Sequence, residues 1–327
     1  MNCWFVRAVL LLICLLAFPF RSPAPLVFNP AEGWVYESPG GSAGSWQRNR
    51  AQDQLKVAEE ALVNNDISTA LKAARRTVKV WPFSDFSPQA QYLIGRCYEA
   101  KGQDEKAFAA YQDVLAKYPK IENYQEILHR QFQIATRFLG GQWFKLFGYI
   151  PFFPSMEKTA GMYEKIIKNG PYSDIAPQAQ MDIGSAREKQ SNFPLAVKAY
   201  ERAADRYSDR KDVAADALFK AGLAYNKQAK TAEYDQSIAG RAIASFIDFM
   251  ALFPGDNRIP EAQKLIASLK SEQARGSFQT AKFYEKNEQW DGALIYYNEV
   301  LLKDPESHLA SAARERIDSL KNRAGQN

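Results

Sequence analysis

The chain has 327 residues, of which 46% are hydrophobic and 24% charged, so its composition is that of a folded protein and excludes a disordered chain. The formal net charge is +5, and +3 remains beyond residue 24, because Arg7 and Arg21 precede that point and no acid does. This charge is too small to favour nucleic acid as a partner, and Lys and Arg are interspersed with Asp and Glu as on solvated surfaces.

The first 24 residues predict an export signal. Arg7 supplies a short positive region, and the uncharged apolar run Ala8–Phe20 is too short for a comfortable membrane span. Pro25 would follow the cut, which is unfavourable, so an uncleaved anchor stays open as an alternative. Lipid attachment at Cys14 is a further alternative with a poor local pattern, because Ile13 is not small. Export indicates a bacterial envelope protein.

Residues 25–50 predict an extended tether. They contain three Pro, several Gly and Ser, and two Trp, and they show no clear period. Such a segment holds a folded part away from a membrane or crosses the surface of another protein.

The rest of the chain repeats a pair of short amphipathic helices. In the clearest copy, Gly95 and Tyr98 share one face of a first helix that Gly102 ends, and Ala107 and Tyr111 form the apolar stripe of a second. The small residues lie where the helix axes approach, and the tyrosines fill the space beside them. This spacing resembles the tetratricopeptide family: a small residue, an aromatic three on, an alanine twelve on, an aromatic four later, then proline.

Six copies can be read in register between residues 51 and 322. The small residues of the successive first helices are Ala58, Gly95, Ala135, Gly184, Gly222 and Ala281. Residues 307–322 predict one more amphipathic helix as an end cap, and residues 323–327 a short tail. The predicted fold is therefore all-α, a tetratricopeptide-like superhelix of about six helical hairpins with a C-terminal capping helix and no convincing strand.

A ten-residue motif joins consecutive pairs. It reads PFSDFSPQAQ from Pro82 and PYSDIAPQAQ from Pro171, with weaker copies from Pro254 and Pro305. The first proline is predicted to end a helix, the Ser-Asp pair to supply turn and capping oxygens, and the second proline to occupy a first helical position.

These junctions, the exported leader and the repeat number resemble the BamD (ComL-like) family of outer-membrane assembly factors. The segments AIASFIDFMALFPGD and AKFYEKNEQWDGALIYYNEVLLKDPES carry the resemblance best. It implies a periplasmic, membrane-associated scaffold that docks on a BamA-like barrel assembly subunit and helps bind unfolded outer-membrane proteins, with the N-terminal repeats nearer the client. Family members are usually lipid-anchored through a cysteine at the cleavage site, for which this chain has no good match. A general envelope adaptor for cell-wall or secretion machinery, and more remotely a cell-wall hydrolase, stay open.

In an array of this kind the first helices line a concave groove, which accepts an extended segment or a helix of a partner. The candidate groove residues are Gln89, Tyr92, Arg96 and Glu99 in the second repeat, and Gln178, Met181, Ser185 and Glu188 in the fourth. They mix apolar contact with hydrogen-bonding and charged groups. The alternative is that several of them face water or the neighbouring repeat.

Residues 139–154 are predicted to interrupt the third repeat with an aromatic insertion of about twelve residues. The stretch FLGGQWFKLFGYIPFF contains seven aromatic residues and a single charge, Lys145. The candidate anchors for a partner or a membrane surface are Trp143, Phe144, Phe147 and Tyr149. The alternative is that this loop folds back and seals a gap between its own helices. A second insertion, the polar QAKTAEYDQS in repeat five, predicts a surface loop.

The sequence shows no pattern for catalysis, a cofactor or a metal. His129 and His308 have no Cys or His at metal-ligand spacing, and no Gly-rich phosphate loop follows a strand. Cys97 is interpreted as a small buried hydrophobe within a first helix. We therefore expect a binding protein, not an enzyme.

Overall fold

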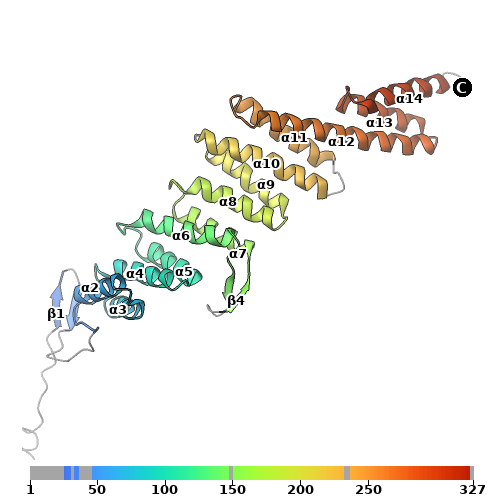
Figure 1. Ribbon diagram of the computed structural model, residues 1–327. Helices are drawn as coiled ribbons and strands as arrows, with labels where there is room; N and C mark the ends of the chain where they lie inside the picture. The colour runs from blue at the N-terminus through green and yellow to red at the C-terminus, as the bar shows by residue number, and fades with distance from the viewer. Residues whose placement is uncertain (1–25, 31–32, 37–45, 147–149, 232–235, 325–327) are drawn as a thin grey trace, which may run out of the picture. The chain divides into compact units, whose positions relative to one another are not determined.

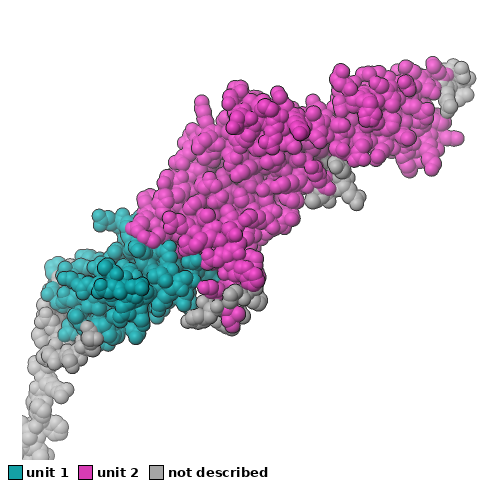
Figure 2. Space-filling view, viewed as in Figure 1, with its two compact units in different colours: residues 1–124 teal, residues 125–327 magenta. Residues whose placement is uncertain are grey.

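The computed structural model describes residues 26–30, 33–36, 46–146, 150–231 and 236–324. They form two compact units, Met1–Tyr124 and Gln125–Asn327 (Figure 2). The predicted export signal lies outside the described residues. Within the described part of the chain, no helix has the length and apolarity needed to cross a membrane.

The first unit contains two helical pairs and a short β-hairpin (Figure 1). The hairpin pairs β1 (Leu26–Asn29) with the antiparallel β2 (Gly33–Tyr36), so the expectation of no strand is wrong here. The helices are α2 (Ala51–Val63), α3 (Ile67–Val80), α4 (Ser87–Ala100) and α5 (Asp104–Lys117). Each packs on the next, and α2 also packs on α4, as stacked helical hairpins do.

The second unit continues the pattern with four pairs and a final helix. Its helices are α6 (Tyr124–Leu139), α7 (Met156–Asn169), α8 (Ala176–Lys189), α9 (Phe193–Arg206), α10 (Lys211–Thr231), α11 (Gln236–Leu252), α12 (Ile259–Lys286), α13 (Trp290–Lys303) and α14 (His308–Ala324). From α7 onward each helix packs on the next, and α14 covers α12 and α13. The predicted all-α tetratricopeptide fold, its six pairs and its capping helix are confirmed.

The small residues and the aromatic residues meet as the spacing predicts. A Cβ atom on Gly95 would lie 2.3 Å from Tyr111 Cε1, and one on Gly184 would lie 2.3 Å from Tyr200 Cε1. Both tyrosine rings are fully buried. The Tyr111 hydroxyl donates to Glu99 Oε2 at 2.8 Å, which satisfies a phenol that would otherwise be buried without a partner.

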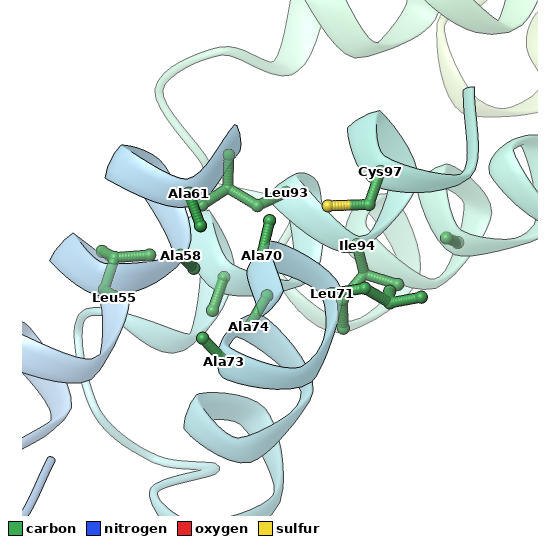
Figure 3. Close-up of a cluster of buried hydrophobic side chains, with 12 residues drawn as sticks. Leu55, Ala58, Ala61, Ala70, Leu71, Ala73, Ala74, Leu93, Ile94 and Cys97 are labelled. Carbon is green, nitrogen blue, oxygen red and sulfur yellow. The ribbon is translucent and has the colours of Figure 1, made fainter. Parts of the chain in front are cut away.

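The core of the first unit is built largely from alanines, which let its helices approach closely (Figure 3). Its members include Leu55, Ala58, Ala61, Ala70, Leu71, Ala73, Ala74, Leu93, Ile94 and Cys97. The Cys97 side chain is fully buried among them, which confirms its interpretation as a small core residue.

The junction motif places its second proline at the start of a helix, as expected, but its Ser-Asp pair does not cap that helix. The second prolines, Pro88 and Pro177, are the second residues of α4 and α8, one position later than predicted but still in the first turn. The capping expectation is wrong, because the N-cap residues are Phe86 and Ile175, whose side chains make no capping bond. The Ser173 hydroxyl instead donates to Gly170 O at 2.7 Å within the turn.

The two insertions also differ from expectation. Between α6 and α7, β3 (Phe144–Leu146) pairs with the antiparallel β4 (Ile150–Phe153), so a second strand pair was missed. The predicted polar loop QAKTAEYDQS is mostly helix: its first four residues end α10 and its last two begin α11. Ala229 is buried in the core of this repeat, and burial explains why helix continues there. Residues 232–235 lie outside the described residues.

One arginine ties a junction to two helices of the second unit. Arg258 Nη1 lies 2.8 Å from Asp216 Oδ1 on α10, and its Nη2 lies 2.8 Å from Asp256 Oδ2 in the junction. The guanidinium also lies 4.9 Å from the ring centre of Phe219 and 5.3 Å from that of Phe249. This arginine therefore joins α10, α11 and the start of α12 through charge and aromatic contact together.

Candidate partner-binding surfaces

The candidate residues of the second repeat lie along α4 and are largely engaged with their own repeat. Tyr92 is only 3% exposed, and its ring centre lies 5.9 Å from that of Tyr111. Arg96 covers the same ring and donates from Nη1 to Tyr92 Oη at 3.1 Å. The Glu99 carboxylate accepts from Tyr111. A partner at this surface would meet the half-exposed Gln89, Arg96 and Glu99, with Tyr92 beneath them.

The candidate residues of the fourth repeat lie along α8. Met181 is 2% exposed and packs in the core with Tyr200. Gln178 Nε2 donates to Asp182 Oδ1 at 2.9 Å, and burial raises the pKa of that aspartate. Ser185 Oγ lies 3.4 Å from Tyr200 Oη. Glu188 pairs with Lys227 on α10 at 3.5 Å, so this row connects neighbouring first helices.

The structure also shows a surface on α12 that sequence reasoning missed. Two clefts of about 520 Å³ each adjoin there and share Gln279 and Phe283. Trp290 of α13 and Arg316 of α14 complete the second cleft. The candidate groove positions of the second and fourth repeats have equivalents in the sixth repeat, and these lie on α12. They are Arg275, Phe278, Lys282 and Glu285, so the same spacing could have indicated this helix.

The α12 surface offers an exposed aromatic anchor, Phe283, beside lysine side chains. Phe283 is 64% exposed and lines the cleft together with Lys282 and Lys286. The Glu285 carboxylate is occupied, because it accepts from Tyr297 Oη at 2.6 Å and from the Arg316 guanidinium. Burial and this carboxylate raise the pKa of Tyr297 to about 12. Such a surface suits a partner with an apolar side chain beside acidic groups.

Some side chains of the aromatic insertion pack against its own helices, and others are exposed at the surface. Phe144 is 4% exposed and stacks on Phe138 of α6 with ring centres 4.1 Å apart. Trp143, Ile150 and Phe153 are largely exposed. Phe147 and Tyr149 lie outside the described residues. The hairpin thus has one residue that seals α6 and at least three that remain accessible.

One of the two histidines, His129, lies beside a carboxylate. His129 Nε2 lies 3.2 Å from Asp174 Oδ2, and both side chains are largely exposed. Across the part of the chain that the structure describes, no three His, Cys, Asp or Glu residues are grouped so that they could hold a metal ion.

Cys97 is expected to be unreactive while the protein is folded. Burial raises the pKa of its thiol to about 11, so little thiolate exists at pH 8, and the sulfur is out of contact with solvent. Iodoacetamide at pH 8, followed by peptide mass spectrometry, should leave Cys97 unmodified in the native chain and modify it in urea. Native labelling at the rate of an unstructured peptide would contradict this burial.

The stacked hairpins and their open faces define a tetratricopeptide-repeat protein. Residues 55–120 match the model of the tetratricopeptide repeat family. Residues 155–326, just over half of the chain, match the model of the YfiO family, described as outer membrane lipoprotein. The chain therefore belongs to the YfiO family and is a BamD-like tetratricopeptide protein, which confirms the resemblance. Proteins of these two families are typically non-catalytic interaction scaffolds, and the YfiO description indicates the cell envelope.

Several solved structures of helical-repeat proteins are similar to the chain. The C-terminal part of a tetratricopeptide protein from Cytophaga hutchinsonii is 16% identical, with a TM-score of 0.37 over 82% of this chain and 88% of that one. A tetratricopeptide repeat protein from Parabacteroides merdae is 12% identical, with a TM-score of 0.31 over 83% and 98%. MamA (41-end) from Desulfovibrio magneticus is 14% identical, with a TM-score of 0.33 over 63% and 97%. No curated protein sequence matches this chain.

Proposed function

We propose that this protein is a non-enzymatic scaffold of outer-membrane β-barrel assembly, on the periplasmic side of the outer membrane. The observation that carries the proposal is the YfiO match over residues 155–326, the segment that contains α7 to α14. Open helix faces with exposed aromatic anchors support a binding role, because buried aromatic contacts dominate the energetics of protein interfaces.

The α12 surface is the proposed docking site for a BamA-like barrel assembly subunit. It lies within the YfiO segment, and Phe283 supplies a large exposed ring whose burial would favour association. Lys282 and Lys286 beside it would orient an acidic partner surface and raise the association rate more than the affinity.

The rows along α4 and α8 are the proposed contact sites for unfolded outer-membrane proteins. Both present an amide and charged groups above a buried side chain, Tyr92 in one and Met181 in the other, and the α8 row adds the Ser185 hydroxyl. Hydrogen-bonding groups above a buried, well-packed side chain suit the binding of an extended peptide segment of variable sequence. Trp143 of the aromatic hairpin is a further proposed anchor.

Photo-crosslinking inside the envelope tests the docking site. A crosslinking amino acid at Phe283 should capture a barrel assembly subunit, whereas the same group at Leu302, an exposed position on the second helix of that repeat, should not. Phe283→Ala should weaken recovery of that subunit roughly tenfold, as expected for an aromatic anchor. Recovery of cell-wall or secretion proteins with no barrel assembly component would favour the general adaptor and reject this proposal.

A further inference from the structure

The base of the β3–β4 hairpin is fixed to the neighbouring helices of the second unit. The Phe144 ring stacks on Phe138 of α6 with ring centres 4.1 Å apart. Lys189, the last residue of α8, donates from Nζ to the carbonyl oxygen of Leu139, the last residue of α6, at 2.6 Å. From this base the hairpin extends away from the ends of α6 and α7 (Figure 1). Because the base is held before any ligand arrives, binding requires little further ordering.

The hairpin presents apolar side chains to solvent at two levels. At its base, Trp143 directly precedes β3 and is 52% exposed, and Phe153, which pairs with Phe144, is 40% exposed. At the far end, Ile150 begins β4 and is 58% exposed. A strand rises about 3.3 Å per residue, so Ile150 lies about 10 Å beyond Phe153. Interfacial segments bury their apolar side about 5–10 Å into the boundary between lipid headgroups and acyl chains, which matches this length.

The hairpin and its flanking residues are positively charged. The stretch Ile127–Met156 contains no Asp or Glu. The first acid after it, Glu157, accepts hydrogen bonds from the Arg187 guanidinium through both carboxylate oxygens, which neutralises its charge. Lys145 on β3 and Lys158 in the first turn of α7 therefore add positive charge that no acid of the hairpin offsets. Such a charge complements an anionic surface.

Lys158 places one of these cations level with the aromatic rings at the base. Its Nζ lies 5.0 Å from the ring centre of Phe144 and 5.8 Å from that of Phe153. At membrane interfaces aromatic rings sit at the level of the headgroups, and lysine side chains extend along apolar surface to keep their ammonium groups there. The base of the hairpin thus has the chemistry of a headgroup contact, and its far end, with Ile150, has that of a contact with the upper acyl chains.

A lipid surface fits this hairpin better than a protein partner does. Of its exposed apolar side chains that the structure describes, only Trp143 has a hydrogen-bonding group, the indole N–H. Specific protein interfaces average roughly one hydrogen bond per 100–200 Å², whereas a fluid lipid surface requires no such matching. The outer edges of a two-stranded sheet leave backbone groups unpaired, which excludes the hairpin from the hydrocarbon core. It therefore suits the headgroup layer and does not span a bilayer.

We propose that the β3–β4 hairpin lies in the headgroup layer of an anionic phospholipid membrane. Ile150 and Phe153 are buried in that layer, and Lys145 and Lys158 pair with lipid phosphates. Trp143, proposed above as a client anchor, stays at the boundary between lipid and water, where a client segment at the membrane surface can contact it. This contact goes beyond the proposed function, because it attaches the second unit to the membrane without using the α12 surface.

Residue-specific quenching in phospholipid vesicles tests this contact. The full chain is reconstituted with a fluorescent amino acid in place of Ile150 or, as a matched control, in place of Tyr172, an exposed ring outside the hairpin. The vesicles contain phosphatidylglycerol and lipids brominated near either the glycerol end or the methyl end of the acyl chain. Bromine near the glycerol end should quench the probe at Ile150 at least roughly twofold more than the probe at Tyr172, and more than bromine near the methyl end does.

The charge of the hairpin is tested in the same vesicles. Replacing phosphatidylglycerol by zwitterionic phosphatidylcholine should reduce the quenching at Ile150, and Lys145→Gln should weaken the hairpin contact with anionic vesicles roughly fivefold. Lys117→Gln removes an exposed lysine outside the hairpin and should have no effect.

Three results would overturn the proposal. The first is quenching at Ile150 no greater than at Tyr172, and the second is equal quenching at Ile150 in anionic and zwitterionic vesicles. The third is capture of a protein by a crosslinking amino acid at Ile150 in envelopes, without quenching in vesicles, which would assign the hairpin to a protein partner. Crosslinking from Phe283 is read separately, so failure of the membrane contact leaves the α12 docking proposal standing.

Discussion

Replacing Gly184 by alanine is expected to destabilise the second unit by about 1–3 kcal/mol, the usual cost of overpacking a core. The new Cβ would lie 2.3 Å from Tyr200 Cε1 and 2.6 Å from its Cζ. The ring is fully buried in a core with Met181 and Ala203, so it has no room to retreat. The clash exceeds the gain in helix propensity from glycine to alanine, which is at most about 1 kcal/mol.

Gly161 provides the matched control in the neighbouring helix. It lies inside α7, and a Cβ there would meet no atom within 4 Å. Gly161→Ala should therefore stabilise the protein by about 0.5–1 kcal/mol through helix propensity and a less flexible unfolded chain. Urea unfolding followed by circular dichroism measures both changes, and hydrogen exchange shows whether the loss is centred on α8 and α9. If Gly184→Ala were as stable as the wild type, this close packing of Gly184 against Tyr200 would be contradicted.

Removal of Arg258 is expected to cost about 2–3 kcal/mol, somewhat less than the loss of one partner from a fully buried ion pair, because the side chain is 26% exposed. Arg258→Ala leaves Asp216 and Asp256 without their common cation and uncovers two aromatic rings, Phe219 and Phe249. Arg258→Lys should recover only part of the loss, since one ammonium cannot make the two-pronged contact with Asp256, bond Asp216 and stack on the rings at the same time.

At acidic pH the difference in the free energy of unfolding between the wild type and Arg258→Ala should become smaller. The Arg258 guanidinium holds the pKa of Asp256 below its usual value, so this contribution is complete above about pH 4 and is lost as the pH falls through the lower folded value. Urea unfolding between pH 7 and pH 2 checks the trend. As a control, Lys117→Ala removes an exposed ion pair with Asp113 and should lower the free energy of unfolding by at most about 0.5 kcal/mol. If Lys117→Ala destabilised the protein as much as Arg258→Ala does, the special role of Arg258 would be contradicted.

The repeat register could be predicted because its signals are local. A small residue in a first helix and an aromatic sixteen positions later meet in any antiparallel pair of this length, as Gly95 and Tyr111 do. The strand pairs could not be predicted, because short apolar runs rich in glycine have no distinctive period. The helical part of QAKTAEYDQS was missed because burial of Ala229, a tertiary contact, overrides a polar local composition.

The candidate surfaces were predicted only as positions along a helix. Register placed Tyr92 and Met181 on the first helices, but their burial depends on rings from the second helices, Tyr111 and Tyr200. The α12 clefts depend on side chains from α13 and α14. No local pattern encodes such contacts, because they join residues distant in sequence.

The sequence by itself therefore determined the helical hairpins, their number and their close approach, since each follows from spacing within about 34 residues. Only the tertiary structure decided that Tyr118 bonds the Ser87 side chain, whereas Tyr207, at the matching position 89 residues later, has a hydroxyl with no hydrogen-bond partner among the described residues. It also decided which aromatic rings stay in water, as Phe283 does. The physical reason is that hydrogen bonding and exposure are set by every neighbour in space, whereas helix periodicity is set by neighbours along the chain.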